Sequence, residues 1–353
     1  MFLAFKEIKK EKLRYGLIIL MIFLISYLIF MLSSLAIGLA QENTQAVDAW
    51  QIKKIVLNKN SNINLAQSML TEKDLKKAKL GSKEALIGET PVVAKIKHHP
   101  SVSAQFIGIK SKQFIYKNLE LISGRKAKTA KEVVVDQAFK LKGYKLGQKI
   151  SLNDSKTKYK IVGFVNNAKI NIAPIVYGRL SVWRKLRGGM PNVKATAIIS
   201  QRDNYDYHYH NAKTYPAKTF INKLPGYTAQ NATFGLMIGF LFVISLIIIA
   251  VFLYILTMQK MHNFAVMRAQ GIPSKTLVGA TVSQSIILVV IGVVIALAAM
   301  WLTEFAIPAS VPMNFTPAIM VIGSVGMLVM GIIGSLIPIR SILKVDPAKA
   351  IGE

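Results

Sequence analysis

Four long apolar stretches constrain this chain more than any other feature of its sequence. None of them contains Asp, Glu, Lys or Arg, and each exceeds the roughly 20 residues that a helix needs to cross a bilayer. They cover residues 15–40, 234–258, 277–302 and 317–339. A polar segment, 41–230, separates the first stretch from the second. The sequence therefore predicts a polytopic α-helical membrane protein with four transmembrane helices and a large extracytoplasmic domain between the first and second spans.

The first apolar stretch also has a feature of a secretory signal peptide. Its small residues Gly38 and Ala40 resemble a signal-peptidase cleavage site. The apolar part of a signal peptide, however, is only about 7 to 15 residues long. Because residues 15–40 form a longer run, we expect this stretch to be retained as a membrane span.

Basic residues in the short connecting segments predict the orientation. Five lie in the N-terminal segment 1–14, three in the loop 259–276 and three in the tail 340–353, whereas the segment 303–316 has none. Short cytoplasmic segments carry an excess of Lys and Arg. We therefore expect both termini and the loop 259–276 in the cytoplasm, and the domain 41–230 outside the cell.

The net charge of +28 is concentrated in the predicted outer domain. Of 45 basic residues, 34 lie between Glu42 and Gln230, together with 12 of the 17 acidic ones. Such a basic chain is typical of nucleic-acid binding, but a domain outside the cell meets no nucleic acid. Its basic surface either serves solubility or faces membrane lipid, cell-wall polymers or an anionic substrate.

Several chemical functions are excluded by residues that the chain lacks. It has no Cys, so thiolate metal sites and cysteine nucleophiles are impossible. It contains no serine-hydrolase, zinc-protease or phosphate-loop motif. We therefore expect no enzymatic activity, no metal and no tightly bound cofactor, and ATP-driven work would require a separate subunit. The absence of charged residues from the spans also argues against an ion relay.

The outer domain has the mixed pattern of an α+β fold. Alternating and β-branched stretches bounded by turn residues are typical of strands. The predicted strands are 54–57, 103–109, 132–135, 149–152, 159–165 and 195–200, and the predicted helices are 63–70, 72–79, 111–118 and 136–141.

One cluster in this domain resembles a ligand site. Residues 205–210 read Tyr-Asp-Tyr-His-Tyr-His. On a strand, His208 and His210 would share a face and could hold a metal or haem. The same pattern is also typical of an exposed polar loop, and the sequence leaves both interpretations open.

Small residues recur in the spans, where they allow helices to approach closely. This contact is either packing within one bundle or the seam of a dimer. The residues are Ser33, Ser34, Ala36, Gly38, Gly323, Gly326, Gly331 and Gly334.

Three segments resemble the FtsX-like permeases of MacB-type ABC transporters. Residues 261–276 are similar to a cytoplasmic segment of that family, although Asn263 stands where an acidic residue is usual. Residues 339–351 resemble the family's closing segment, and 131–165 resemble a pattern of its outer domain. The order of one span, a large outer domain and three further spans is also the family's.

This resemblance implies a non-catalytic permease that works as a homodimer with two copies of an ABC ATPase subunit. It implies that the amphipathic start of the chain and the two cytoplasmic segments transmit force from the ATPase. The residues expected to do so are Phe5, Ile8, Met267, Arg268, Gly271, Asp346 and Pro347.

Within the family, residues 4–44 are most similar to the haem-exporting permeases of Gram-positive bacteria. Haem as substrate would need apolar walls and an axial ligand. The resemblance implies Glu42 as the ligand, with walls from Leu35, Leu39, Phe234 and Met237. Glu42 has an alternative interpretation, as a structural residue at headgroup level. Alternative functions are signal transmission to cell-wall hydrolases and export of antimicrobial peptides or lipoproteins.

Overall fold

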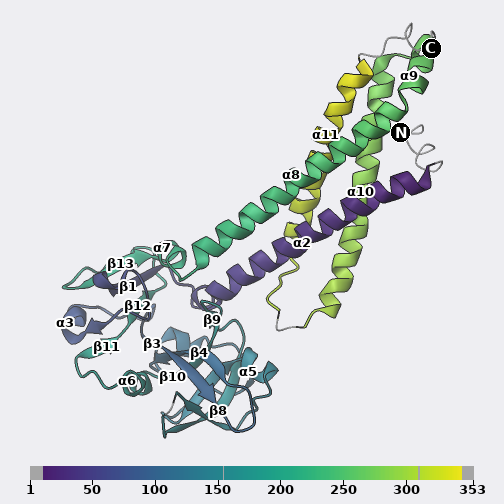
Figure 1. The fold of residues 1–353 in the computed structure, drawn as a ribbon. Helices are drawn as coiled ribbons and strands as arrows, with labels where there is room; N and C mark the ends of the chain where they lie inside the picture. The colour runs from purple at the N-terminus through teal and green to yellow at the C-terminus, as the bar shows by residue number, and fades with distance from the viewer. Residues whose placement is uncertain (1–10, 154, 309–310, 344–353) are drawn as a thin grey trace. The chain divides into compact units, whose positions relative to one another are not determined.

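The computed structural model describes residues 11–153, 155–308 and 311–343 and separates the chain into two compact units. The membrane unit comprises the chain up to Gly38 and from Ala232 onward, and the outer unit comprises Leu39–Asn231. Figure 1 shows the long helices of the first unit and the strands of the second. The predicted fold class is confirmed.

Within the described residues, four helices are long and apolar enough to cross a membrane: α2 (Lys12–Ala49), α8 (Tyr227–Gln259), α10 (Ser274–Ala306) and α11 (Pro317–Leu343). The first three extend beyond their apolar stretches at both ends, and α11 extends beyond its stretch only at its C-terminal end. A short helix, α9 (Met261–Ala269), lies between α8 and α10.

The glycines of α11 provide the close contacts between spans. A methyl group on Gly323 would come within 2.7 Å of the Phe30 ring on α2, and one on Gly331 within 2.7 Å of Val289 on α10. Gly326 and Gly334 likewise face Phe242 and Ile249 on α8. In a single chain, therefore, all four glycines of α11 serve packing within the bundle.

The outer unit is built on an 11-stranded sheet with the order β13-β1-β12-β3-β4-β10-β6-β8-β5, to which β7 and β9 attach, while β2 and β11 form a separate pair. The bounds of the strands are β1 Lys54–Asn58, β2 Leu70–Thr71, β3 Glu84–Lys95, β4 Val102–Ile109, β5 Leu121–Gly124, β6 Glu132–Asp136, β7 Lys149–Leu152, β8 Lys158–Val165, β9 Lys169–Ile170, β10 Ala173–Arg179, β11 Val193–Ala195, β12 Ala197–Ser200 and β13 Ala212–Pro216.

Short helices connect these strands. They are the 3₁₀ turn Lys59–Ser61, α3 (Glu72–Leu75), α4 (Phe114–Lys117), α5 (Gln137–Leu141), α6 (Leu180–Leu186) and α7 (Ala217–Asn222).

The long strand β3 belongs to both halves of the sheet. Its first part, Glu84–Ile87, pairs with β12, and its second part, Gly88–Ala94, pairs with β4. We call β13, β1, β12 and α7 the first lobe, and β4, β10, β6, β8 and β5 the second lobe. The two lobes are therefore joined by continuous main-chain hydrogen bonding through one strand.

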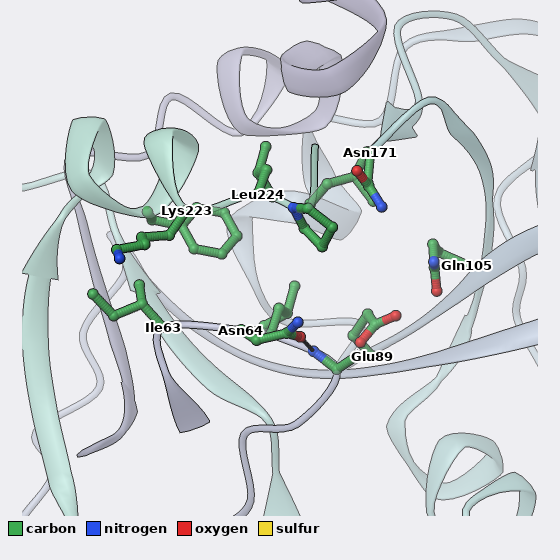
Figure 2. A pocket seen from close by; sticks show the side chains of 12 residues that line it. Ile63, Asn64, Glu89, Gln105, Asn171, Lys223 and Leu224 are labelled. Carbon is green, nitrogen blue, oxygen red and sulfur yellow. Dashed lines mark hydrogen bonds between the residues drawn. The ribbon is translucent and has the colours of Figure 1, made fainter. Parts of the chain in front are cut away.

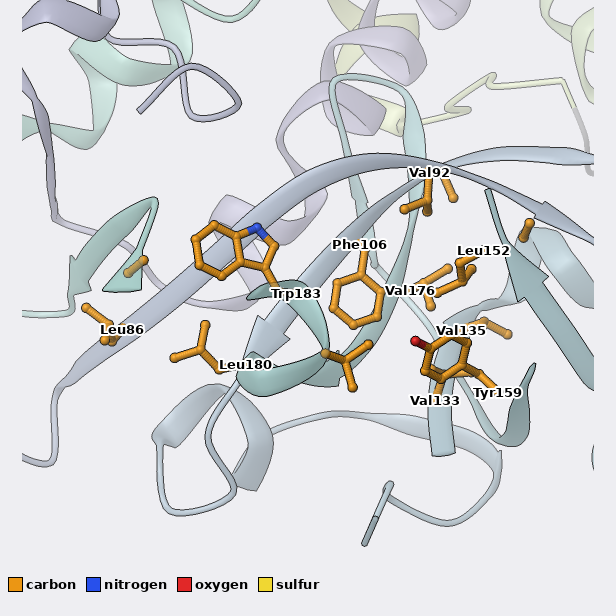
Figure 3. Close-up of a cluster of buried hydrophobic side chains, with 14 of the residues drawn as sticks. Leu86, Val92, Phe106, Val133, Val135, Leu152, Tyr159, Val176, Leu180 and Trp183 are labelled. Atoms are coloured by element: carbon orange, nitrogen blue, oxygen red, sulfur yellow. The ribbon is translucent and has the colours of Figure 1, made fainter. Parts of the chain in front are cut away.

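Two apolar cores lie on opposite faces of the sheet, because successive side chains of a strand point to opposite sides. Figure 3 shows one core, in which Trp183 of α6 packs beside Phe106 and Val176. A methyl group on Gly88 would lie 2.2 Å from the Trp183 ring, so glycine at this point lets α6 lie against β3. The other core contains Ile107 and Trp50.

The strand predictions are confirmed for β1, β4, β6, β7, β8 and β12. The structure contradicts the helix predicted at 63–70, which is a series of turns. The side chain of Asn64 accepts hydrogen bonds from the backbone N–H groups of Ala66 and Gln67. Such local bonds compete with helix formation, and Asn62 and Ile63 adopt positive φ angles. The helices predicted at 72–79 and 111–118 shorten to α3 and α4.

Gly323→Ala should lower the thermal stability of the bundle. Because Phe30 is fully buried, the added methyl group cannot be relieved by a simple movement of the ring, and such overpacking costs about 1 to 3 kcal/mol. Gly239→Ala is the matched control, since it lies in α8 with open space where its methyl group would go. Thermal unfolding of the purified chain in detergent, followed by far-ultraviolet circular dichroism, measures both. Equal midpoints for the two variants would contradict the packing role of Gly323.

Candidate functional site

The segment after α8 ends in a rigid turn. The N–H of Ile272 donates to the carbonyl of Met267 at 3.0 Å, and that of Gly271 donates to the carbonyl of Arg268 at 3.0 Å. This bond pair is the Schellman motif, which needs a residue with positive φ after the helix. Gly271 meets that need with a φ of +88°, and Pro273 is the N-cap residue before α10, which begins at Ser274. The residues Arg268 to Pro273 thus set the direction from α9 into α10.

The helix α9 is fixed to two membrane spans through one small apolar cluster. Phe264 of α9 is buried against Leu277 of α10 and Ile342 of α11, and Met267 and Ile272 pack at the edge of this cluster. A force on α9 therefore reaches both spans directly. Among the residues predicted to couple to an ATPase, Met267 packs against this cluster and Arg268 and Gly271 form the turn beside it. Phe5, Ile8, Asp346 and Pro347 lie outside the described residues.

A buried polar cluster lies at the end of the bundle next to α9, and the sequence analysis did not identify it. Lys260, only 8% exposed, donates to the Tyr15 hydroxyl at 2.7 Å. Gln284 of α10 donates to the same hydroxyl. The cluster joins α2, α10 and the junction of α8 with α9. A lysine close after an apolar span was the available signal, but Tyr15 lies 245 residues from Lys260 and 269 from Gln284, and only the fold brings them together.

Glu42 forms an ion pair with Lys169 of β9, and only 15% of its side chain is exposed. The backbone reinforces this contact, since the N–H of Asn171 donates to the carbonyl of Asn43 at 3.1 Å. Glu42 and Leu39 belong to the outer unit, whereas Leu35, Phe234 and Met237 belong to the membrane unit. The grouping of these five residues into one site stays a prediction.

A buried carboxyl, Asp136, lies close to this ion pair. It accepts hydrogen bonds from the N–H groups of Ala138 at 2.8 Å and Ala168 at 3.2 Å. Burial raises the pKa of Asp136 to about 6, against the charge of Lys169, which lowers it. Glu42, Lys169 and Asp136 therefore form one electrostatic group, in which any change at Glu42 alters the charge balance at Asp136.

The membrane unit contains an open apolar pocket of about 380 Å³ at the ends of α10 and α11 that face the segment 307–316. Its walls are mostly aromatic, aliphatic and thioether side chains, with one carboxylate, Glu304. The lining residues are Leu297, Met300, Trp301, Glu304, Phe315, Pro317, Met320 and Val321. Apolar walls with a few polar groups are typical of small-molecule sites, and the sequence analysis did not identify this pocket.

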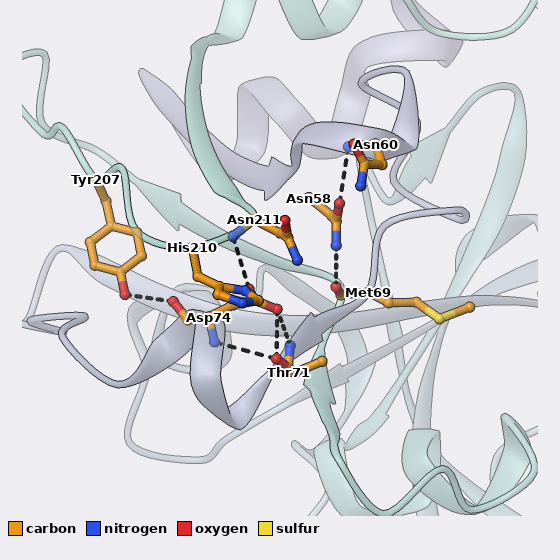
Figure 4. Close-up of polar contacts among 8 residues, drawn as sticks. All are labelled: Asn58, Asn60, Met69, Thr71, Asp74, Tyr207, His210 and Asn211. Carbon is orange, nitrogen blue, oxygen red and sulfur yellow. Dashed lines mark hydrogen bonds and ion pairs between the residues drawn. The ribbon is translucent and has the colours of Figure 1, made fainter.

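The side chains of the histidine cluster, residues 205–210, make structural contacts. Figure 4 shows His210 beside the buried Asp74, with 2.7 Å between His210 Nδ1 and Asp74 Oδ1. Burial alone would raise the pKa of Asp74, but hydrogen bonds from Thr71, His210 and Asn211 hold it below its usual value. Tyr207 donates to the Asp74 carbonyl at 2.6 Å, and no metal-binding group of His and acidic residues occurs within the described ranges. The arrangement favours the polar-loop interpretation.

Comparisons with known proteins identify a family model and several relatives. Residues 235–347 match the model described as FtsX-like permease C-terminal. Over 353 residues, 99% of each chain, the protein is 27% identical to a Staphylococcus epidermidis protein described as the hemin transport system permease HrtB. A Staphylococcus haemolyticus protein of the same description is 26% identical over 352 residues, again 99% of each chain.

Solved structures with some likeness come from outer domains of transporters. The periplasmic region of MacB from Actinobacillus actinomycetemcomitans shares 14% identity and a TM-score of 0.36, covering 48% of this chain and 92% of that one. The extracellular domain of YknZ from Gram-positive bacteria shares 16% identity and a TM-score of 0.31, covering 42% and 82%.

Asp136→Asn should change how stability depends on pH. The folded wild type keeps a proton on Asp136 up to about pH 6, whereas the unfolded chain loses it near 3.8. The wild type therefore loses stability as pH rises between these values, by about 3 kcal/mol for a shift of about two pKa units. Asparagine can still cap α5 but carries no proton to lose. Thermal unfolding from pH 4 to 7 should show a flatter profile for Asp136→Asn, and an unchanged profile for the exposed control Asp203→Asn. Parallel profiles for Asp136→Asn and wild type would refute the raised pKa.

Proposed function

We propose that this chain is an ABC transporter permease, as its FtsX-like match over residues 235–347 supports, and that it exports haem or a similarly amphipathic toxic compound. The observation that carries the proposal is the extent of the similarity to the staphylococcal HrtB proteins, which covers 99% of both chains. Both the spans and the outer domain are therefore included in the similarity.

ATP hydrolysis is assigned to a partner, because a permease of an ABC system works with an ATPase subunit and this sequence has no phosphate loop. We propose two ATPase copies beneath a permease homodimer in the cell membrane of a Gram-positive bacterium, with both termini in the cytoplasm. Closure of the two ATPases would press on α9. The Phe264 cluster and the Gly271 turn would transfer that movement to α10 and α11 as a rigid-body displacement.

We propose two candidate places for haem, which requires apolar walls with a ligand for iron or a cation for a propionate. The first is Glu42 with Leu35, Leu39, Phe234 and Met237. For Glu42 to ligate iron, its ion pair with Lys169 must open, and the released ammonium group could then meet a propionate. The second is the apolar pocket that contains Trp301 and Glu304.

Haem titration of the purified permease in detergent, followed by absorbance, should give saturable binding that Glu42→Ala weakens at least tenfold, a loss of about 1.4 kcal/mol. The matched control is Asp48→Ala, which removes an exposed carboxylate from the same helix. A Glu304→Ala variant and a double His208→Ala, His210→Ala variant test the other places, and we expect both to bind haem as the wild type does.

Other outcomes would correct the proposal. Loss only in Glu304→Ala would move the site to the apolar pocket, and loss only in the double histidine variant would move it into the outer domain. No saturable binding in any form would refute haem as cargo. Export of peptides or lipoproteins, or signalling to cell-wall hydrolases, would then be the functions to test.

Phe264→Ala should separate binding from transport. Removing a buried Phe leaves a cavity that lowers the free energy of unfolding by about 3 to 5 kcal/mol. Here the cavity weakens the packing of α9 against α10 and α11. We expect unchanged haem affinity and unchanged co-purification with the ATPase, but a loss of haem tolerance in cells that depend on the exporter. Val290→Ala, an exposed position on α10, is the control. Normal tolerance in Phe264→Ala cells would refute the role of α9 in coupling.

A further inference from the structure

A second pocket, of about 90 Å³, lies inside the outer unit where the two lobes meet. It has room for several water molecules or one small organic molecule. Figure 2 shows side chains converging on it from the loop after β1, from α7 and its end, and from the β3–β4 pair. Leu65, Phe220 and Leu224 make much of its wall apolar. The pocket belongs to neither place proposed for haem.

Two hydrogen-bond acceptors at this pocket have no partner within the described residues. They are Oε2 of Glu89, a residue only 3% exposed, and Oε1 of Gln105. In the sheet, Glu89 pairs with Ile107 and Gln105 pairs with Pro91. The two side chains are therefore diagonal neighbours on one face of the sheet. Buried polar groups are almost always hydrogen-bonded, so two unpartnered acceptors at one cavity indicate a missing donor.

Nearby basic groups do not supply that donor. Arg187 of α6 donates to the backbone carbonyl of Glu89 at 3.3 Å and to that of Ala66 at 2.8 Å. It faces the main chain of β3, and no ion pair with the Glu89 carboxylate is formed. Lys223 also lines the pocket, and Figure 2 shows it on the opposite side from Glu89. Burial raises the pKa of Glu89 to about 7, against the charge of Arg187.

The backbone at the rim of the pocket is held in unusual conformations. Ile63 has a φ of 59° and Asn171 a φ of 51°, and both residues line the cavity. A β-branched residue such as Ile63 rarely adopts this region, and such conformations cluster at binding sites. Asn adopts this region readily, so Ile63 is the position that local preference does not explain.

We propose that this pocket binds a small organic cation, with an ammonium or guanidinium group held between the Glu89 carboxylate and the Gln105 amide oxygen. The N–H groups would satisfy both acceptors, and the positive charge would compensate the buried carboxylate. A short apolar body would contact Leu65, Phe220 and Leu224. Because these walls belong to the first lobe and Gln105 to the second, the bound cation bridges the two lobes.

The test is a titration of the full-length permease in detergent with butylammonium chloride. Trp183 is a built-in reporter, since its indole N–H donates to the Glu89 carbonyl at 2.8 Å. With 5-fluorotryptophan incorporated, the three tryptophans of the chain give separate fluorine resonances, and Trp183→Phe assigns the relevant one. We expect a saturable shift of this resonance with butylammonium and none with tetramethylammonium, which has the same charge but no N–H group.

Three variants make the site assignment specific. Glu89→Gln should weaken butylammonium binding at least tenfold, whereas Glu120→Gln, an exposed position with the same change of charge, should leave it unchanged. Ala66→Leu should block binding by filling the cavity while Glu89 remains. Affinity in the wild type should rise as pH increases through about 7, because Glu89 then ionises. Arg187 and Lys223 are the charged groups around it.

The proposal is overturned if the wild type gives no saturable shift, if tetramethylammonium binds equally well, or if Glu89→Gln and Ala66→Leu keep wild-type affinity. The result is independent of the proposed export function, because haem titration of Glu89→Gln should match the wild type in either case.

Discussion

Hydrocarbon offers neither water to expel nor hydrogen-bond partners, so the spans of this protein can be held together only by close packing and a few internal polar contacts. Both devices are present. Glycines of α11 admit Phe30 and Val289 along the length of the bundle. The Tyr15 hydroxyl binds Lys260 and Gln284 at the end next to α9. This cluster lies where the proposed force from an ATPase would enter.

The outer unit is stabilised differently, because in water the burial of apolar surface is the main source of stability. Its two cores cover both faces of the sheet, and the residues that depart from this pattern are few. Asp136 and Glu89 are buried carboxyls whose pKa values are raised by that burial. One lies beside the ion pair of Glu42 and the other at the junction of the lobes. The cost of burying them falls at two of the three places for which ligands are proposed.

Hydropathy and periodicity were sufficient for the four spans and for strands such as β1 and β8, since these depend on residues adjacent in sequence. They missed β3, in which Gly88 and Pro91 interrupt the strand pattern. Main-chain pairing nevertheless continues, with β12 before Gly88 and with β4 from Gly88 onward. They also gave a helix at 63–70, where Asn64 instead closes a turn. The pockets could not be predicted, because Glu89, Gln105 and Phe220 meet only after folding. Glu42 was identified by resemblance, while its partner Lys169 required the structure.

The sharing of β3 between the lobes has a consequence for how this domain can be handled and for how it can evolve. A fragment that contains only one lobe would leave half of β3 with unpaired N–H and C=O groups, and such an open edge recruits other strands and aggregates. Proteolysis within β3 would expose the same edge in both halves. Recombination between relatives should therefore exchange the whole outer domain, with its boundaries in α2 and α8, and seldom a single lobe.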